Sequence, residues 1–511
     1  MESGSFGGRA VDAEAHIANF RKNILAELSG QTSRLRSGLA FRAGRETGIR
    51  KLRRSSIVGL TLATYALCLG PAAAESMSGA LSRAYSNNPD VNQARAGVRA
   101  QDETVPGAKA GWLPKVNAQG SIGHQFTRNT NPPGAAAREQ KYLTDPTTGS
   151  VTLTQTLFDG MRTANSVDQA ESGVLAAREN LRGSEISTLG DAATFYMDVL
   201  RDTAVLGLRR NNVKVLQVQL QQTRDRFHVG EVTRTDVAQA ESSLANGTAD
   251  VAVAEARLQA SMANYRRVIG VEPRQLQPAQ PIEKLLPPSL DLAVATGLSE
   301  NPAVIGALHQ VDVAEDQVKI NEGALLPQIG VQAQVQNQTD AQGVPGYGIY
   351  TASVVGVLNV PIYQGGSEYA QVRQSKEKLS QARLAVETQR YKVRSDVVTA
   401  WGNLQSSRAA ITSFQAAVKA AEIALTGVRE EAKVGQRTTL DVLNAEQTLL
   451  NTRVQLVQAQ HDRVVASYSV MAAIGRLTAR NLGLGVVAYD PNHHYDQTKN
   501  RFFGLNTPDG R

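Results

Sequence analysis

One nine-residue string occurs twice in the 511-residue chain, as VGEVTRTDV at residues 229–237 and as VGQRTTLDV at residues 434–442. Each copy follows a long stretch without proline and carries a glycine at its second position, Gly230 or Gly435. A glycine at the end of a helix adopts the left-handed conformation without a steric penalty and stops the helix. Both strings therefore predict a tight turn between two helices.

The residues after each glycine suit the start of a returning helix. Threonine is a favoured N-cap residue, and an aspartate in the first turn is stabilised by the helix dipole. The candidate caps are Thr233 or Thr235 and Thr438 or Thr439, with Asp236 and Asp441 in the first turns. A well-capped helical hairpin would explain most of both strings without any further function.

The two strings belong to a longer self-match. At the same offset of 205 residues, Leu157–Gly160 matches Ile362–Gly365 and Ile269-Gly270 matches Ile474-Gly475, while Asn88-Pro89 recurs as Asn301-Pro302 at an offset of 213. The first copy thus holds eight extra residues, which fall between Pro114 and Leu157. Insertions are tolerated in exposed loops, so a solvent-facing hairpin tip is expected there.

Apolar residues spaced by seven predict long coiled-coil helices in both copies. Residues 159–229 contain no proline, and about 1.5 Å per residue gives roughly 105 Å of helix, which suits a tube or rod. The heptad positions are Val199, Leu206, Val213, Leu220 and Phe227, matched by Leu404, Ile411, Val418, Leu425 and Ala432. The predicted helices cover residues 159–229, 235–270, 365–433 and 439–475, with a further helix opening each copy.

Alternating apolar and polar residues predict two strands per copy, at about residues 115–128, 149–158, 328–338 and 350–361. The pattern fits either strands of a transmembrane barrel or a half-buried soluble sheet. Trp112, Phe158 and Tyr363 lie at strand ends, as aromatic residues at a membrane interface do. Four strands cannot close a barrel, so several chains would have to share one.

The formal charge of +7 arises mainly at the N-terminal end. A basic stretch from Lys51 to Arg54, an apolar stretch from Ile57 to Leu69 and a small-residue site at Ala72–Ala74 are typical of a secretory signal peptide. Residues 1–74 hold 11 basic and 5 acidic residues, which leaves a net charge of +1 for the remainder. This balance argues against a nucleic-acid partner. Removal of the segment also removes the only cysteine, Cys68.

The sequence has no motif for catalysis or for a cofactor. It lacks a phosphate-binding loop, a zinc-protease helix motif and paired cysteine ligands. The adjacent pair His493-His494 lies in a polar tail and is interpreted as solvated rather than as a metal site. We therefore predict a non-enzymatic protein without cofactor or metal.

The predicted layout begins with an N-terminal extension at residues 1–50 and a signal peptide at residues 51–74, with a non-Met start near Leu52 as the alternative. Repeat 1 then covers 75–270, a linker 271–289, repeat 2 290–482 and a tail 483–511. The tail has no counterpart in repeat 1. The sequence leaves open whether it packs around the equator of a tube or stays disordered.

With its doubled turn, Asn-Pro openings and Leu-Pro junctions, the chain from Glu75 to about Leu482 resembles the TolC family of outer-membrane efflux and secretion ducts. The resemblance implies a homotrimer with a 12-stranded barrel in the cell outer membrane and a helical tube in the periplasm. Its implied partners are a periplasmic adaptor protein, an inner-membrane pump or ABC transporter, and outer-membrane lipid.

The resemblance also implies residue roles at the periplasmic entrance. Asp236 and Arg437 are candidates for polar links that hold it closed, and Asp441 for an acidic ring. Asn444 and Ala432 stand where a second acid and a gate tyrosine are often found, so the latch is expected to differ. The implied adaptor-docking positions in the turns are Val229, Gly230, Thr233, Val434, Gly435 and Thr438.

The function predicted is the exit duct of an efflux pump or type I secretion system, with the cargo undetermined. The alternative is a structural coiled-coil protein of the periplasm or cell surface, whose strand pairs would form a soluble head. A periplasmic adaptor is a minor third possibility, because adaptors are expected to carry one helical hairpin rather than two.

Overall fold

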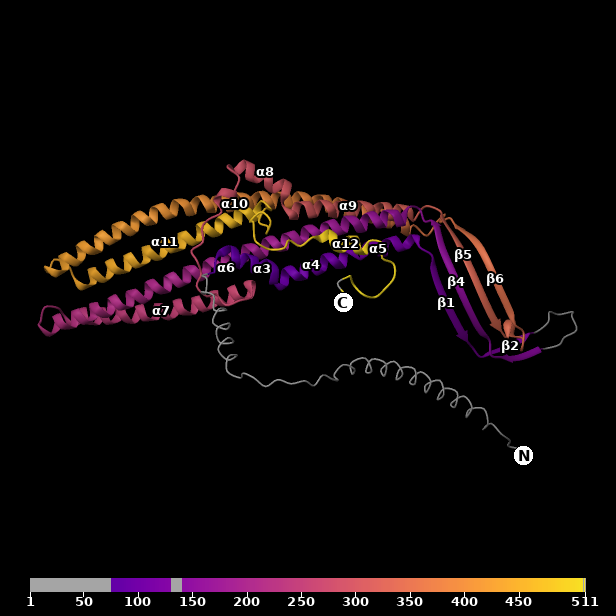
Figure 1. Cartoon of the computed structure of the whole chain (residues 1–511), viewed down its shortest axis with the longest axis horizontal. Coiled ribbons are helices and arrows are strands. Elements are labelled where there is room, and N and C mark those ends of the chain that lie inside the picture. Colours follow the sequence, from indigo (N-terminus) through magenta and orange to yellow (C-terminus); the bar gives the residue numbers. More distant parts are fainter. Residues whose placement is uncertain (1–74, 130–139, 509, 511) are drawn as a thin grey trace, which may run out of the picture. The chain divides into compact units, whose positions relative to one another are not determined.

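The computed structural model describes residues 75–129, 140–508 and 510, so the predicted extension and signal peptide lie outside the described residues. The chain is mainly helical with few strands (Figure 1). Two 67-residue helices, α6 (Arg162–His228) and α10 (Ser367–Lys433), each return through a shorter helix, α7 (Arg234–Ile269) and α11 (Thr439–Ala473). Beyond these two hairpins, α9 (Pro302–Gly323) packs against both α6 and α10. The remaining helices are α3 (Met77–Asn87), α4 (Pro89–Asp102), α5 (Thr104–Lys109), α8 (Leu290–Glu300) and α12 (Pro491–Thr498).

Where the sequence predicts one helix at the start of each copy, the structure has a chain of separate helices. The first break falls at Asn88-Pro89 and the second at Asn301-Pro302, because proline disfavours a helical residue before it. Each asparagine caps the new helix, with Asn88 Oδ1 accepting from the Asp90 amide at 2.7 Å and Asn301 Oδ1 from the Ala303 amide at 2.9 Å. Their side-chain amides donate to the last turns of α7 and α11, at the carbonyls of Val268 and Ala473.

The main hydrophobic core lies where α3, α6, α7 and α11 meet the segment that joins the two copies. Tyr196 and Tyr265 are fully buried in it. The Tyr196 hydroxyl contacts two backbone carbonyl oxygens, those of Glu75 at 2.8 Å and Gln277 at 2.7 Å. Glu75 also exchanges backbone hydrogen bonds with Gln275 and Gln277. The joining segment is thus fixed to the beginning of the described chain.

Four strands form one antiparallel sheet in the order β1-β4-β5-β6. They are β1 (Lys115–Ile122), β4 (Thr147–Phe158), β5 (Gln328–Thr339) and β6 (Ile349–Asn359). Strands β4 and β5 are almost 200 residues apart in the sequence, and their pairing joins the two halves of the chain at the centre of the sheet. In the single chain β1 and β6 are the edges.

Directly paired residues point to the same side of a sheet, and in the central rows of this one the register separates an apolar face from a polar face. One row across the four strands is Val116, Leu153, Ala333 and Val354, and the next row on that face is Ala118, Val151, Val335 and Ala352. The opposite face carries Asn117, Thr152, Gln334 and Ser353, then Gln119, Ser150, Gln336 and Thr351. Across these four described strands Lys115 is the only charged side chain.

The single strand expected at residues 115–128 is two strands in the structure. After β1 the chain passes through Gly123 and continues as β2 (Gln125–Asn129), which pairs with β3 (Gln140–Thr144) in a separate two-stranded sheet. Proline has no amide hydrogen for a strand ladder, so pairing is interrupted at Pro146, whose carbonyl accepts from the Gly123 amide at 3.0 Å. The expected tip of this longer hairpin, residues 130–139, lies outside the described residues.

The tail is folded rather than structureless. Helix α12 packs on α4, where His494 Nδ1 lies 2.9 Å from Asp102 Oδ2, with both side chains buried. Within the part of the chain that the structure describes, no helix is long and apolar enough to cross a membrane.

Candidate functional site

The turns of the two long hairpins have the same geometry. Gly230 and Gly435 adopt left-handed φ values of +81° and +78°. After each, the next amide reaches back to close the helix: Glu231 donates to the Arg226 carbonyl at 2.9 Å, and Gln436 to the Glu431 carbonyl at 3.0 Å. The doubled string therefore encodes two equivalent helix ends.

Each returning helix begins with a capping box, in which the cap and the third helical residue satisfy one another's backbone amides. Thr233 Oγ1 accepts from the Asp236 amide at 3.3 Å, and Asp236 Oδ2 accepts from the Thr233 amide at 2.9 Å. The second turn repeats this with Thr438 and Asp441, at 3.2 and 3.0 Å. Of the alternatives that the sequence leaves open, Thr233 and Thr438 are the caps.

These hydrogen bonds hold both carboxylates in the charged form. Bonds from the Thr233 hydroxyl and amide lower the pKa of Asp236, and bonds from the Thr438 amide and hydroxyl lower the pKa of Asp441. Within one described chain, the hydrogen bonds of both acids stay inside their own hairpins. Each acid therefore has a structural role besides the one expected at the entrance.

Arg437 and Asn444 are exposed near the second turn. Arg437 Nε donates to Glu431 Oε2 at 2.8 Å, within the same hairpin, and this bond together with the nearby charges raises the pKa of Arg437. Asn444 lies on the first turns of α11 with its side chain in solvent. Among the described residues, the structure brings Arg437 close to Glu431 and not to Asp236.

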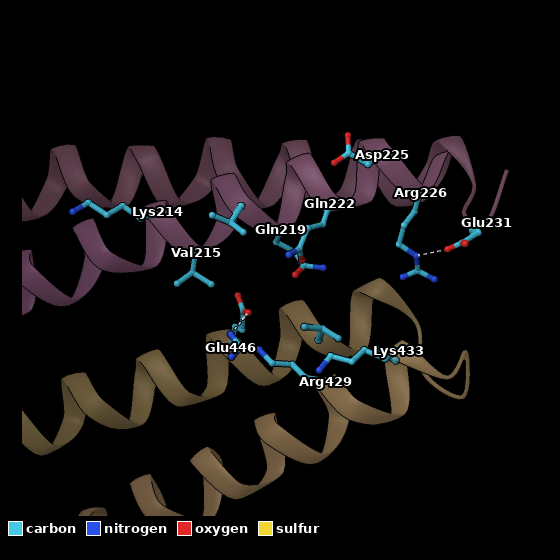
Figure 2. A pocket seen from close by; sticks show the side chains of 13 residues that line it. Lys214, Val215, Gln219, Gln222, Asp225, Arg226, Glu231, Arg429, Lys433 and Glu446 are labelled. Atoms are coloured by element: carbon cyan, nitrogen blue, oxygen red, sulfur yellow. Dashed lines mark hydrogen bonds and ion pairs between the residues drawn. The ribbon is translucent and has the colours of Figure 1, made fainter. Parts of the chain in front are cut away.

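A groove of about 870 Å³ separates the two hairpins near their turns (Figure 2). Hairpin α6–α7 contributes Lys214, Val215, Val218, Gln219, Gln222, Asp225, Arg226 and Glu231, and hairpin α10–α11 contributes Arg429, Ala432, Lys433, Val442 and Glu446. Ala432, the expected substitute for a gate tyrosine, is thus one of the groove's lining residues. Its methyl group leaves space that a larger side chain would fill.

Glu446 is the one buried acid of this groove among the described residues. Its side chain is 5% exposed, and its Oε1 accepts from Arg429 Nη2 at 2.8 Å. Its second oxygen, Oε2, is buried without a hydrogen-bond partner among the described residues. The equivalent pair in the first copy, Arg224 and Glu241, is joined at 2.6 Å with both side chains about half exposed.

Sequence reasoning did not identify Glu446 as a functional candidate, although Ala445-Glu446 follows the second string at the same distance as Ala240-Glu241 follows the first. Arg429 and Glu446 stand 205 residues after Arg224 and Glu241, the offset of the sequence self-match. That correspondence predicts an ion pair in both hairpins. It does not predict burial of one, which depends on how closely α11 approaches α6.

Further from the turns, a charged network joins the two hairpins. His461 on α11 contacts Asp198 on α6 at 2.9 Å, and Asp198 pairs with Arg201 at 2.8 Å. Arg201 also pairs with Asp202, which accepts from the Ser261 hydroxyl of α7. Burial would raise the pKa of Asp202, but hydrogen bonds from Arg201 and Ser261 outweigh it and lower that pKa. The hairpins are thus tied together at this level, and the groove separates them at their turns.

A second tie comes from the segment between the copies. Glu283 Oε1 accepts from Arg463 Nε at 2.9 Å and from Arg408 Nε at 3.2 Å, and Glu283 Oε2 lies 2.8 Å from Arg408 Nη2. Hydrogen bonds from Arg463 and Arg408 lower the pKa of Glu283 to about 2. One carboxylate therefore clamps the segment to both helices of the second hairpin.

Two long helical hairpins attached to a four-stranded sheet with one polar and one apolar face define a subunit of an outer-membrane channel. The family model described as outer membrane efflux protein matches residues 80–271 and 294–476. The chain belongs to the outer membrane efflux protein family, as its resemblance to the TolC family predicts. It is located in the outer membrane and extends into the periplasm.

The relatives agree with this assignment. The chain is 43% identical over 440 residues to outer membrane efflux protein BepC of Brucella suis, covering 86% of this chain and 94% of BepC. It is 24% identical over 448 residues to outer membrane protein TolC of Escherichia coli, covering 83% and 87% of the two chains. The crystal structure of the Campylobacter jejuni CmeC outer membrane channel superposes with a TM-score of 0.70 at 15% identity, covering 83% of this chain and 89% of that one. Family membership supports the prediction that the protein is not an enzyme.

Proposed function

We propose that three copies of the chain assemble into one export duct with a 12-stranded barrel. The observation that carries this proposal is the alternation in the two central rows of the sheet, where alanine, valine and leucine side chains lie opposite glutamine, serine, threonine and asparagine side chains. A barrel wall needs such alternation, with apolar residues toward lipid and polar residues toward water. Four strands cannot close, and the edges β1 and β6 of one copy are free to pair with those of its neighbours.

Internal duplication of the chain is part of the same proposal. Its support is the recurrence of a 67-residue helix, a left-handed glycine and a capping box in both halves. The two separate stretches that match one family model also support it. Each half of a chain then supplies two strands and one long hairpin, so a trimer holds six hairpins, or twelve helices, around a channel.

The hairpin turns form the periplasmic entrance in this arrangement. Arg437, Asp236, Asp441 and Asn444 remain the candidates for its latch and acidic ring. Val229, Gly230, Thr233, Val434, Gly435 and Thr438 remain the candidate adaptor-docking positions. The duct works with a periplasmic adaptor and an inner-membrane pump or ABC transporter. Residues 51–74 direct export and are removed.

A gene deletion tests the function directly. Loss of the protein should sensitise cells to drugs and detergents, and plasmid-borne protein should restore resistance and migrate as a heat-sensitive trimer from outer-membrane extracts. A defect confined to secreted proteins would assign the duct to type I secretion. Unchanged susceptibility and secretion, with release of a soluble rod without detergent, would favour the structural coiled-coil alternative.

Planar bilayers test the entrance. Replacing Arg437→Ser should loosen it and raise the single-channel conductance. Asp441→Ala should reduce block by multivalent cations. Asp236→Ala also removes a capping box, so comparing the two variants separates loss of a cap from loss of the acid expected in the ring. Equal block in both variants and in the original protein would show that Asp441 faces away from the pore, and an unchanged conductance would remove Arg437 from the latch.

A further inference from the structure

The segment that follows α12 presents apolar side chains to solvent. Phe503 is 91% exposed, Leu505 is fully exposed and Phe502 is exposed as well. The Arg501 amide donates to the Thr498 carbonyl at 2.8 Å, and Arg501 Nε contacts the Phe503 carbonyl. The run is thus a short ordered turn, which we call the aromatic turn (residues 501–505). Two phenylalanines and a leucine in so short an exposed run are unusual on a water-facing surface.

The aromatic turn is held in a defined place by α12. Besides the buried pair of His494 and Asp102, the Tyr495 hydroxyl lies 3.2 Å from Glu171 of α6, and Arg178 stacks over the Tyr495 ring at 5.4 Å. At the end of α12, the Lys499 carbonyl accepts from Lys109 Nζ of α5 at 3.4 Å. These contacts bring the aromatic turn beside α5 (Figure 1).

Helix α5 ends where the chain enters the sheet. Lys109 is followed by a short 3-10 helix, Ala110–Trp112, and then by β1. Four extended residues reach at most about 14 Å, so Phe503 lies within that distance of Lys499. The exposed side chains of Trp112 and, after β6, Ile362 and Tyr363 mark the same junction between helices and strands. Because Lys499 contacts Lys109, three residues before Trp112, the aromatic turn lies within reach of the level where the apolar face of the sheet begins.

We propose that the aromatic turn inserts into the headgroup region of the outer membrane's periplasmic leaflet and contacts phospholipid there. This inference rests on the proposed barrel, which sets the level of the membrane. Aromatic side chains favour the boundary between headgroups and acyl chains, and the guanidinium of Arg501 provides a positive charge for lipid phosphates. The tail thus adds a membrane contact on the periplasmic side of the barrel, outside the repeated units.

Spin labels can locate the turn in the intact protein. In a Cys68→Ala background, single cysteines are introduced by Leu505→Cys, Val487→Cys and Val354→Cys, and the labelled proteins are reconstituted into vesicles of phosphatidylethanolamine and phosphatidylglycerol. Val487 is 95% exposed in the same tail before α12, and Val354 is 76% exposed on the apolar face of β6. Relaxation by oxygen reports lipid, and relaxation by a water-soluble nickel chelate reports water.

Labels at 505 and 354 should be relaxed by oxygen and shielded from the chelate, whereas the label at 487 should be reached by the chelate. A label at 505 that behaves like 487, while 354 reports lipid, would overturn the inference and leave the barrel intact. A label at 505 reached by neither reagent would place the turn against protein, which also overturns it. Chelate access at 354 would refute the barrel, and the inference with it.

Discussion

Replacing Glu283→Gln should detach the joining segment from the second hairpin without unfolding the protein. The pKa of Glu283 is lowered to about 2 from an ordinary value of 4.5, which corresponds to roughly 3 kcal/mol before screening by water. The partner arginines are more than one third exposed, and screening by water reduces the expected loss to about 1–2 kcal/mol. Local opening of the segment should then become roughly 5–30 times more frequent.

Trypsin cleavage after Lys284 measures that opening, because cleavage of a transiently opened segment follows its equilibrium population. Lys284 lies in the short 3-10 helix Glu283–Leu285. The matched control is Glu272→Gln, which removes the exposed pair with Arg266 in the same segment and should change the rate by less than a few fold. Equal rates after Lys284 in Glu283→Gln and Glu272→Gln would refute the reasoning.

The same clamp predicts a pH effect with a definite sign. Because folding lowers the pKa of Glu283, its ionised carboxylate stabilises the folded state fully above pH 4.5, and this stabilisation is lost as the pH falls from 4.5 toward 2. Cleavage of the original segment by pepsin should therefore accelerate across this interval, once corrected for the enzyme's own pH dependence. The Glu283→Gln variant should show no such acceleration, and parallel profiles would contradict the assignment to Glu283.

Three further changes have matched partners in the other half of the chain or in the tail. Gly475→Ala should prevent accumulation of heat-stable protein in the outer membrane, because a Cβ at this position would lie 2.6 Å from Asn301 Cα. Gly270 has a similar φ but open space around it, so Gly270→Ala should cost only about 1–2 kcal/mol, and equal yields of the two variants would contradict this reasoning. Glu446→Ala should destabilise the start of α11 by about 1–3 kcal/mol, since it leaves Arg429 unpaired beside the groove, whereas Glu241→Ala should cost less than about 1 kcal/mol. Hydrogen exchange of residues 439–450 and of the equivalent residues 234–245 measures the two losses, and equal losses would argue against a role for burial. Asp102→Asn should weaken the buried pair with His494, loosen α12 and speed trypsin cleavage after Lys499. Glu171→Gln removes the part-buried contact to Tyr495 and should have a smaller effect; the reverse order would show that the pair of Asp102 and His494 does not hold the tail.

The sequence predicts the helical hairpins well because their signals are local. Glycine, threonine and aspartate at fixed spacing specify the end of one helix and the start of the next, and each hydrogen bond of the cap involves residues within three positions. The strand pattern is equally local, so alternation predicted the four strands of the main sheet. The break in the first strand depends on Pro146, which lies 23 residues after Gly123 and acts across the hairpin.

The parts that escaped sequence reasoning depend on contacts between distant segments. Glu446 is buried because two hairpins approach each other, and nothing adjacent to it in the sequence carries that information. The polar tail is fixed at α12 by the buried contact between His494, interpreted from the sequence as solvated, and Asp102, which lies almost 400 residues earlier. Arg437, in the turn between α10 and α11, pairs with Glu431 of the same hairpin, a contact that the sequence reasoning did not predict.

Apart from Lys115, at the end of β1 next to the helices, the polar face of the four described strands carries no charged side chain, and this has a consequence for passage through the membrane. Side-chain amides and hydroxyls both donate and accept hydrogen bonds, so a wall made of them can replace the hydration of a cationic, anionic or neutral solute without attracting one kind strongly. A ring of fixed charges would instead hold back solutes of its own sign. In the proposed duct, discrimination by charge therefore belongs to the helical end and its junction with the sheet at Lys115, and the polar wall of the strands beyond that junction does not favour either sign.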